Sequence, residues 1–175
     1  MMAALFEAGG QIVFGRLLAD LVSGIAHWLE DRVLPEGIPL LDSQIIQPNR
    51  LHHKDPMAFT RFGSIYRNGT TWAATAAIGA PLLWWLGPSI WLATALLGGA
   101  FANQIHYWAH VPGIAPKWVR TMQLTGFLQS PQGHGRHHRP PSDRAYCILT
   151  DWLNPWLDRW MVWQRLERVL RVKAA

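Results

Sequence analysis

The sequence is poor in charged residues and in cysteine. Only 15% of its 175 residues are Asp, Glu, Lys or Arg, whereas ordinary soluble domains have about 25%, so a large hydrated surface is not expected. The single cysteine, Cys147, excludes a disulfide scaffold. Low charge together with 50% hydrophobic residues excludes intrinsic disorder. The length fits one domain, and we expect residues 1–175 to form it.

The longest stretch without charge lies in the middle of the chain. No Asp, Glu, Lys or Arg occurs between Arg67 and Lys117. Because a membrane-spanning helix needs about 20 apolar residues, this stretch accommodates two spans, residues 71–86 and 89–110, separated by a Gly-Pro break at 87–88. The alternative is a buried helical hairpin of a soluble protein. We favour the membrane, since a small soluble domain seldom buries an uncharged hairpin on all faces.

Residues 5–28 form a third apolar segment, which carries a polar stripe. Arg16 and Asp20 are four residues apart, and Ser23, His27 and Asp31 continue the same helix face. The segment lacks the basic beginning of a secretory signal, so we interpret it as another span. Such a stripe is expected to face a bundle interior or the membrane surface.

The C-terminal third has a different pattern. Residues 118–128 indicate a short amphipathic helix, and residues 129–142 a loop with many Gly, Pro, His and Arg residues. Residues 152–172 indicate an amphipathic helix with Trp and Arg that lies on a membrane. The predicted fold is therefore all-α: a polytopic membrane bundle of three to four embedded helices with additional interfacial helices.

Basic residues predict the orientation of this bundle. Arg61 and Arg67 precede the hairpin, and Lys117 and Arg120 follow it, so the positive-inside tendency places both hairpin ends in the cytoplasm. Arg159, Arg165, Arg168 and Arg171 in the last segment agree. The net charge of +5 is interpreted as a basic surface facing the lipid bilayer, with no nucleic acid as partner. The eleven Trp residues suit membrane interfaces.

All histidines fall on the cytoplasmic side of the predicted bundle. They form four clusters that are distant in the sequence, and they are His27, His52, His53, His106, His110, His134, His137 and His138. His27 ends the first span, and the predicted hairpin ends at His106 and His110. We therefore expect the clusters to converge at one membrane face.

The spacing of these histidines is typical of metal ligands. His106 and His110 are four residues apart, as are His27 and Asp31, so each pair shares one helix face. Neutral imidazole binds Fe, Zn, Cu and Ni, and eight imidazoles exceed the needs of one zinc site. They are enough for two adjacent metals with about four ligands each. A zinc hydrolase of the HExxH type would have Glu directly after the first His of the helix pair, where this chain has Tyr107.

Two His-bound irons in a membrane can activate O2 and remove hydrogen from an unactivated C–H bond. We expect a lipid chain to reach them through a slot between helices, with Gly98 and Gly99 allowing close approach. Carboxylates and amides commonly hold the second nitrogen of a ligating imidazole. The candidates for that role are Asp20, Asp31, Asp55 and Asn103.

The motifs resemble those of the lipid desaturase (Kua-type) family, of which plasmanylethanolamine desaturases are the best-known members. The resemblance covers residues 14–170 in unbroken order. It rests on Asp20–Trp28, His52-His53-Lys-Asp55-Pro56, Asn103-Gln104-Ile-His106-x-Trp108-Ala-His110, His134-x-x-His137-His138, Tyr146-Cys147-Ile, Trp152-Leu-Asn154 and Arg165-Leu-Glu167.

The resemblance implies a multi-span membrane enzyme with a di-iron centre that uses O2. It also implies an electron donor such as cytochrome b5 or a ferredoxin. By this likeness all eight histidines are iron ligands and catalytic residues, and Asp31 is a further catalytic residue, either as a ligand or beside one. The implied reaction converts plasmanylethanolamine into plasmenylethanolamine, the vinyl ether of a plasmalogen.

Two other reactions stay open. Plasmalogen-forming members carry His where Gly126 and Gly133 stand, and the residues around Gly126 are closer to the plant plastid branch, which desaturates an acyl chain of phosphatidylglycerol. The motif beginning at His52 favours the plasmalogen branch. A membrane di-iron hydroxylase, which inserts oxygen into the lipid chain, would have the same ligands.

Overall fold

The computed structural model describes residues 1–170, and these residues contain helices and irregular segments but no strand. Arg171 and the end of the predicted 152–172 helix lie outside the described residues. The α-helices are α1 (Met2–Trp28), α2 (Gln47–Lys54), α3 (Ser64–Leu86), α4 (Ile90–His110), α5 (Lys117–Leu124), α6 (Pro131–His137), α7 (Asn154–Arg159) and α8 (Val162–Leu170). Short π-helical turns lie at Leu29–Val33 and Asp42–Ile46, and a 3₁₀ turn at Phe59–Arg61. The all-α prediction is confirmed for the described part.

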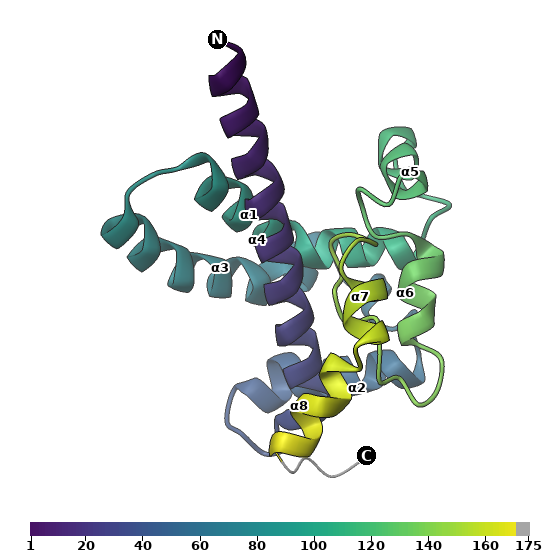
Figure 1. Cartoon of the computed structure of the whole chain (residues 1–175). Coiled ribbons are helices and arrows are strands. Elements are labelled where there is room, and N and C mark those ends of the chain that lie inside the picture. The colour runs from purple at the N-terminus through teal and green to yellow at the C-terminus, as the bar shows by residue number, and fades with distance from the viewer. Residues whose placement is uncertain (171–175) are drawn as a thin grey trace.

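The long helices form a crossed arrangement that positions the rest of the molecule. Helices α3 and α4 make an antiparallel hairpin, and α1 runs across it (Figure 1). Gly87 reverses the chain between them with φ +72°, a conformation that favours glycine. The predicted segment 89–110 corresponds to α4, the predicted segment 71–86 lies within α3, which begins earlier at Ser64, and the predicted segment 5–28 lies within α1.

Glycines bring α4 close to both of its neighbours. A Cβ on Gly15 would lie 2.2 Å from the Trp91 carbonyl oxygen, and one on Gly98 would lie 2.7 Å from Ala19 of α1. A Cβ on Gly99 would lie 3.1 Å from Thr75 of α3. Gly98 and Gly99 thus allow the close approach that was expected of them, and the approach is between helices; a slot for a lipid chain stays a prediction.

The C-terminal third differs from its prediction in three places. Helix α5 ends at Leu124 and does not reach residue 128. The predicted 129–142 loop contains α6, which begins with Ser130 accepting the Gly133 amide and with a proline in the first turn. The predicted 152–172 helix is divided into α7 and α8, because Met161 between them has φ +48°.

One helix in the described part, Met2–Val33, is long and apolar enough to cross a membrane, with a mean hydropathy of 1.4 in its most apolar window. Core helices and signal sequences can meet the same criteria. The hairpin helices have a lower mean hydropathy, although they expose many large apolar side chains, among them Trp84 at 92% and Trp85 at 81%.

Candidate metal centre

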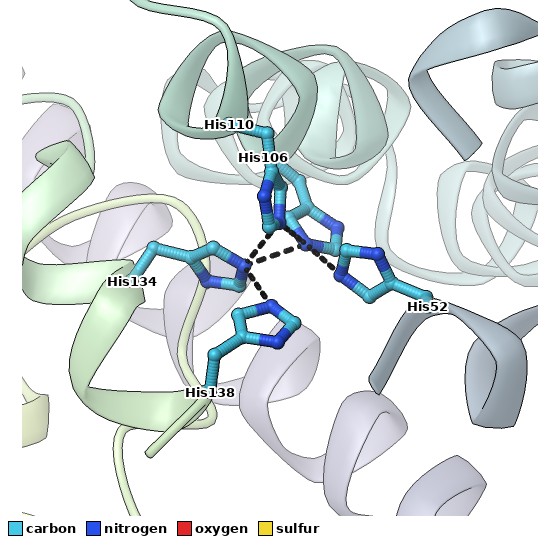
Figure 2. A group of neighbouring side chains, drawn as sticks. All are labelled: His52, His106, His110, His134 and His138. Carbon is cyan, nitrogen blue, oxygen red and sulfur yellow. Dashed lines mark hydrogen bonds between the residues drawn. The ribbon is translucent and has the colours of Figure 1, made fainter. Parts of the chain in front are cut away.

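Five histidines from three helices form the first group of the candidate metal centre. His52 comes from α2, His106 and His110 from α4, and His134 and His138 from α6 and its C-terminal end. Figure 2 shows the five rings pointing toward one another from these elements. One ligand atom of each lies within 4.8 Å of the others.

The Nε2 atoms of this group are closely spaced. His106 Nε2 lies 3.0 Å from that of His52, 2.9 Å from that of His134 and 3.2 Å from that of His110. His134 Nε2 is also 2.7 Å from His110 Nε2 and 2.9 Å from His138 Nε2. Two nitrogens bound about 2.1 Å from one metal ion are separated by roughly 3.0–3.4 Å at octahedral or tetrahedral angles. The Nε2–Nε2 distances of this group are therefore close to those of imidazoles bound to one metal ion.

His27, Asp31, His53 and His137 form the second group, again within 4.8 Å of one another. Asp31 Oδ2 lies 2.9 Å from His53 Nε2, 3.1 Å from His137 Nε2 and 3.6 Å from His27 Nε2. The other oxygen of this carboxylate accepts a hydrogen bond from Asn49 Nδ2. The carboxylate thus stands among three imidazoles that come from α1, α2 and α6.

The two groups adjoin each other. The ring centroids of His137 and His138 are 5.5 Å apart, and those of His53 and His138 are 5.2 Å apart. His27 of the second group lies 5.7 Å from His106 of the first. The structure thus brings all eight histidines and Asp31 together. The first group has five residues and the second has four, whereas about four ligands for each metal were expected.

Backbone carbonyls orient two imidazoles of the second group. His27 Nδ1 donates to the Tyr146 carbonyl at 3.1 Å, and His137 Nδ1 donates to the Arg144 carbonyl at 2.8 Å. A neutral imidazole has one N–H, so a proton on Nδ1 leaves the Nε2 lone pair directed at Asp31 and its neighbours. These carbonyls have the role that sequence reasoning gave to side chains.

Three of the four expected side-chain partners do not contact an imidazole. Asp20 accepts hydrogen bonds from Leu149 and Thr150, Asp55 pairs with Arg61, and Asn103 donates to the Arg67 carbonyl. Only Asp31 lies among the imidazoles. The correct partners have no side-chain signature, because any residue offers a carbonyl, and only the folded chain shows which carbonyls are near.

Burial favours the neutral form of several imidazoles. His52 and His134 are 2% and 1% exposed. Burial and the neighbouring imidazoles lower the pKa of His52 and of His134, and they lower the pKa of His138 to about 3. At neutral pH these rings are deprotonated, which is the form that binds metal ions.

The donor set fits metal ions better than it fits an empty hydrogen-bond network. His27 Nε2 is buried and has no hydrogen-bond partner in the described part, although its Nδ1 is paired. Each hydrogen bond joins one donor to one acceptor, so five converging Nε2 atoms cannot all satisfy one another. A cation in each group would satisfy these lone pairs.

Sequence reasoning missed Phe59, which forms one wall of the first group. Its ring centroid lies 4.7 Å from that of His52, 4.8 Å from His106 and 5.4 Å from His110. No spacing rule connects Phe59 with these histidines. It is one of the apolar side chains that limit access of water to the imidazoles.

Comparisons with known proteins add independent findings. A family model described as a lipid desaturase domain matches residues 16–174. The chain is 31% identical to a probable fatty acid desaturase of Acanthamoeba polyphaga mimivirus, over 95% of this chain and 84% of that protein. It is 32% identical to plasmanylethanolamine desaturase 1 of Mus musculus, over 91% of this chain and 64% of that protein.

A plant protein is similar at nearly the same level. The chain is 31% identical to fatty acid desaturase 4, chloroplastic, of Arabidopsis thaliana, over 89% of this chain and 49% of that protein. The chain therefore spans less than two thirds of the mouse and plant proteins. No solved structure matches.

Proposed function

Since the chain belongs to the lipid desaturase family, we propose that it is an oxidoreductase that desaturates a hydrocarbon chain of a membrane phospholipid. The observation that carries this proposal is the convergence of eight histidines and Asp31 into two adjoining ligand groups. Family membership favours O2-dependent oxidation over the other uses of a histidine site.

The proposed cofactor is a pair of iron ions. The first would be held by His52, His106, His110, His134 and His138, and the second by His27, Asp31, His53 and His137. When bound, the irons supply the activation of O2 and the oxidation of an unactivated C–H bond. The all-imidazole group and the group with a carboxylate differ in charge, so the two ions have unequal environments.

The chain's own residues prepare this chemistry. The Tyr146 and Arg144 carbonyls fix the tautomers of His27 and His137, and Asp31 places one negative charge among three imidazoles. Burial of His106, His134 and His137 excludes water from the inner side of both groups. A preorganised, dry ligand set limits side reactions of activated oxygen.

For the substrate we propose plasmanylethanolamine, which would become plasmenylethanolamine. A relative named plasmanylethanolamine desaturase 1 is similar over most of this chain, and His52-His53-Lys-Asp55-Pro56 favours that branch. The electron donor would be cytochrome b5 or a ferredoxin.

A second candidate substrate is an acyl lipid of the plant plastid phosphatidylglycerol type. Plasmalogen-forming members carry His at the position of Gly133, and here a Cβ at Gly133 would lie 2.0 Å from Asp151 Oδ1. The site as built leaves no space for that side chain. This observation, with the Arabidopsis relative, supports the second substrate.

We further propose that the protein is a multi-pass membrane protein with its histidines at the cytoplasmic face. Helix α1 is apolar enough to cross a bilayer. The hairpin carries no formal charge from Asn68 to Pro116 and exposes large apolar side chains to its surroundings. His27 lies at the C-terminal end of α1, and His106 and His110 lie at that of α4.

Lipid analysis of a host that lacks such an enzyme tests the function. Cells that produce the chain should accumulate phospholipids lacking two hydrogens, and vinyl ether or acyl products identify the substrate. The variant His106→Ala, produced at equal level, should abolish the change. A gain of one oxygen would identify a hydroxylase, and an unchanged lipid profile with iron-loaded protein would refute the proposal.

A further inference from the structure

The irregular segment at residues 144–151 is the structural support of the second ligand group. Its Arg144 and Tyr146 carbonyls receive the Nδ1–H groups of His137 and His27. A shift of this segment would move both acceptors at once, and with them the tautomer and direction of two rings. What fixes the segment therefore also fixes the ligand group.

Asp20 of α1 holds this segment. Its side chain is fully buried, at 0% exposed. Oδ1 accepts from the Leu149 amide at 2.9 Å and from the Thr150 amide at 3.1 Å, and Oδ2 accepts from the Thr150 hydroxyl. A buried carboxylate is costly unless it is fully hydrogen-bonded, and here three donors converge on it.

Ser23, three residues later on α1, also binds segment 144–151. Its hydroxyl accepts from the Ile148 amide at 3.2 Å. Asp20, Ser23 and His27 recur at helical spacing, so they lie on one face of α1. The residues that fix the segment and the histidine that the segment orients thus belong to one rigid helix.

The middle of the segment, at Cys147, is held by hydrogen bonds that do not involve α1. Asn154 Oδ1 accepts from the Cys147 amide at 3.0 Å, and Asn154 Nδ2 donates to the Cys147 carbonyl at 2.8 Å. Gln129 Nε2 donates to the same carbonyl at 2.8 Å. Loss of the Asp20 attachment should therefore shift the segment locally while the chain remains folded.

We propose that Asp20 is a positioning residue for the group formed by His27, Asp31, His53 and His137, and that it acts through segment 144–151. The inference rests on the proposed metal-binding function. In the described part of the chain no imidazole of the first group donates to a carbonyl of this segment; the segment reaches that group indirectly, where Asp151 accepts from the Ser130 amide before α6. Asp20 should therefore affect metal binding in one group more than in the other.

Metal titration of the full chain, purified in detergent and stripped of metal, tests the proposal with Fe²⁺ and spectroscopically visible Co²⁺ as probes. The wild type should bind one ion in each group. Asp20→Ala should keep one ion and lower the affinity for the other at least about tenfold. Asp20→Asn should restore most of that affinity, because its amide oxygen can still accept from the two backbone amides.

Glu7→Ala is the matched control, an exposed acid on the same helix that should leave both affinities unchanged. The ion retained by Asp20→Ala shows that the variant is folded. If that variant does not accumulate, Thr150→Val, which removes one bond to Asp20, should weaken the same ion by a smaller factor.

The proposal would be overturned if Asp20→Ala bound both ions with wild-type affinity. If only Thr150→Val accumulates, the same result in that variant would overturn it. Equal weakening of both ions would also overturn it. Because the measurement counts metal and not product, it is independent of the desaturase activity. A chain that loses one ion as expected but never alters lipids would support the positioning role and contradict the proposed function.

Discussion

Asp31 supplies the one carboxylate in a set of ligand candidates that otherwise consists of histidines. Three imidazoles approach its Oδ2 within 3.6 Å, and Asn49 holds its other oxygen. The adjacent acid, Glu30, makes no ion pair with any of these imidazoles in the described part of the chain. Two neighbouring acids therefore offer a controlled comparison.

Asp31→Ala should lower desaturase activity at least about tenfold. Loss of a residue that holds a metal ligand in place commonly lowers metal affinity or activity 10–100-fold. Asp31→Ala should also lower the iron content toward one ion per chain, because it removes a carboxylate from the second group. Glu30→Ala should change neither quantity by more than about twofold. Elemental analysis and product mass spectrometry of the two variants measure both effects, and equal losses would contradict a special role for Asp31.

At the scale of elements, α6 is the helix that the sequence did not predict, and it carries candidate metal ligands of both groups. It carries His134 and His137 on seven residues, Pro131–His137. Ser130 accepts from the Gly133 amide, and Asp151 Oδ2 accepts from the Ser130 amide at 3.1 Å. A helix this short has little intrinsic stability, so these bonds and the packing against α4 hold it in place.

Gly133→Ala should disrupt this start of α6, because the new Cβ would lie 2.0 Å from Asp151 Oδ1 and 2.9 Å from its Cγ. We expect a loss of about 1–3 kcal/mol in unfolding free energy and weaker iron binding, since His134 and His137 move with the helix. Thermal unfolding and iron content measure the two effects. Gly135→Ala is the control, because nothing lies within 4 Å of its Cβ position.

The double variant Gly133→Ala, Asp151→Ala separates the steric cause from helix propensity. Removing the carboxylate relieves the contact, so the double variant should lose less stability than the sum of the single variants. Strict additivity of the two losses would show that the contact with Asp151 is not the cause.

The elements that could be predicted from the sequence are those with long apolar patterns. Helices α1, α3 and α4 coincide with uncharged or apolar runs, and the Gly-Pro break at 87–88 marks the hairpin turn. The pattern could not reveal α6, because Gly133 and Gly135 oppose helix in isolation and tertiary contacts decide its state. The division between α7 and α8 depends on the single backbone conformation of Met161.

The candidate site was predictable in its membership but not in its organisation. Histidine spacing placed pairs on helix faces, and topology placed the clusters together. The division into five and four residues depends on how α2 and α6 meet the ends of α1 and α4, which no local pattern encodes. The same holds for the carbonyls of Arg144 and Tyr146 and for the ring of Phe59.

At the scale of the whole molecule, the candidate metal centre lies where the C-terminal ends of two long helices meet. His27 ends α1, and His106 and His110 end α4. If both helices cross a bilayer, the centre lies at one membrane surface, and the turn between α3 and α4 lies toward the other. The hairpin tip and the residues after α4 should then be accessible from opposite sides.

Single reporter cysteines can test this arrangement, because the native Cys147 thiol is not expected to react. Cys147 is fully buried, and burial raises the pKa of its thiol, so it should not react with maleimides. Pro88→Cys places a reporter at the exposed hairpin tip, and Lys117→Cys places one at the exposed start of α5. In intact cells a membrane-impermeant maleimide should label Pro88→Cys, whereas Lys117→Cys should react only after permeabilisation. If neither reporter is labelled in intact cells, the hairpin does not cross the bilayer. Its tip would then remain on the cytoplasmic side with the basic residues that flank the hairpin.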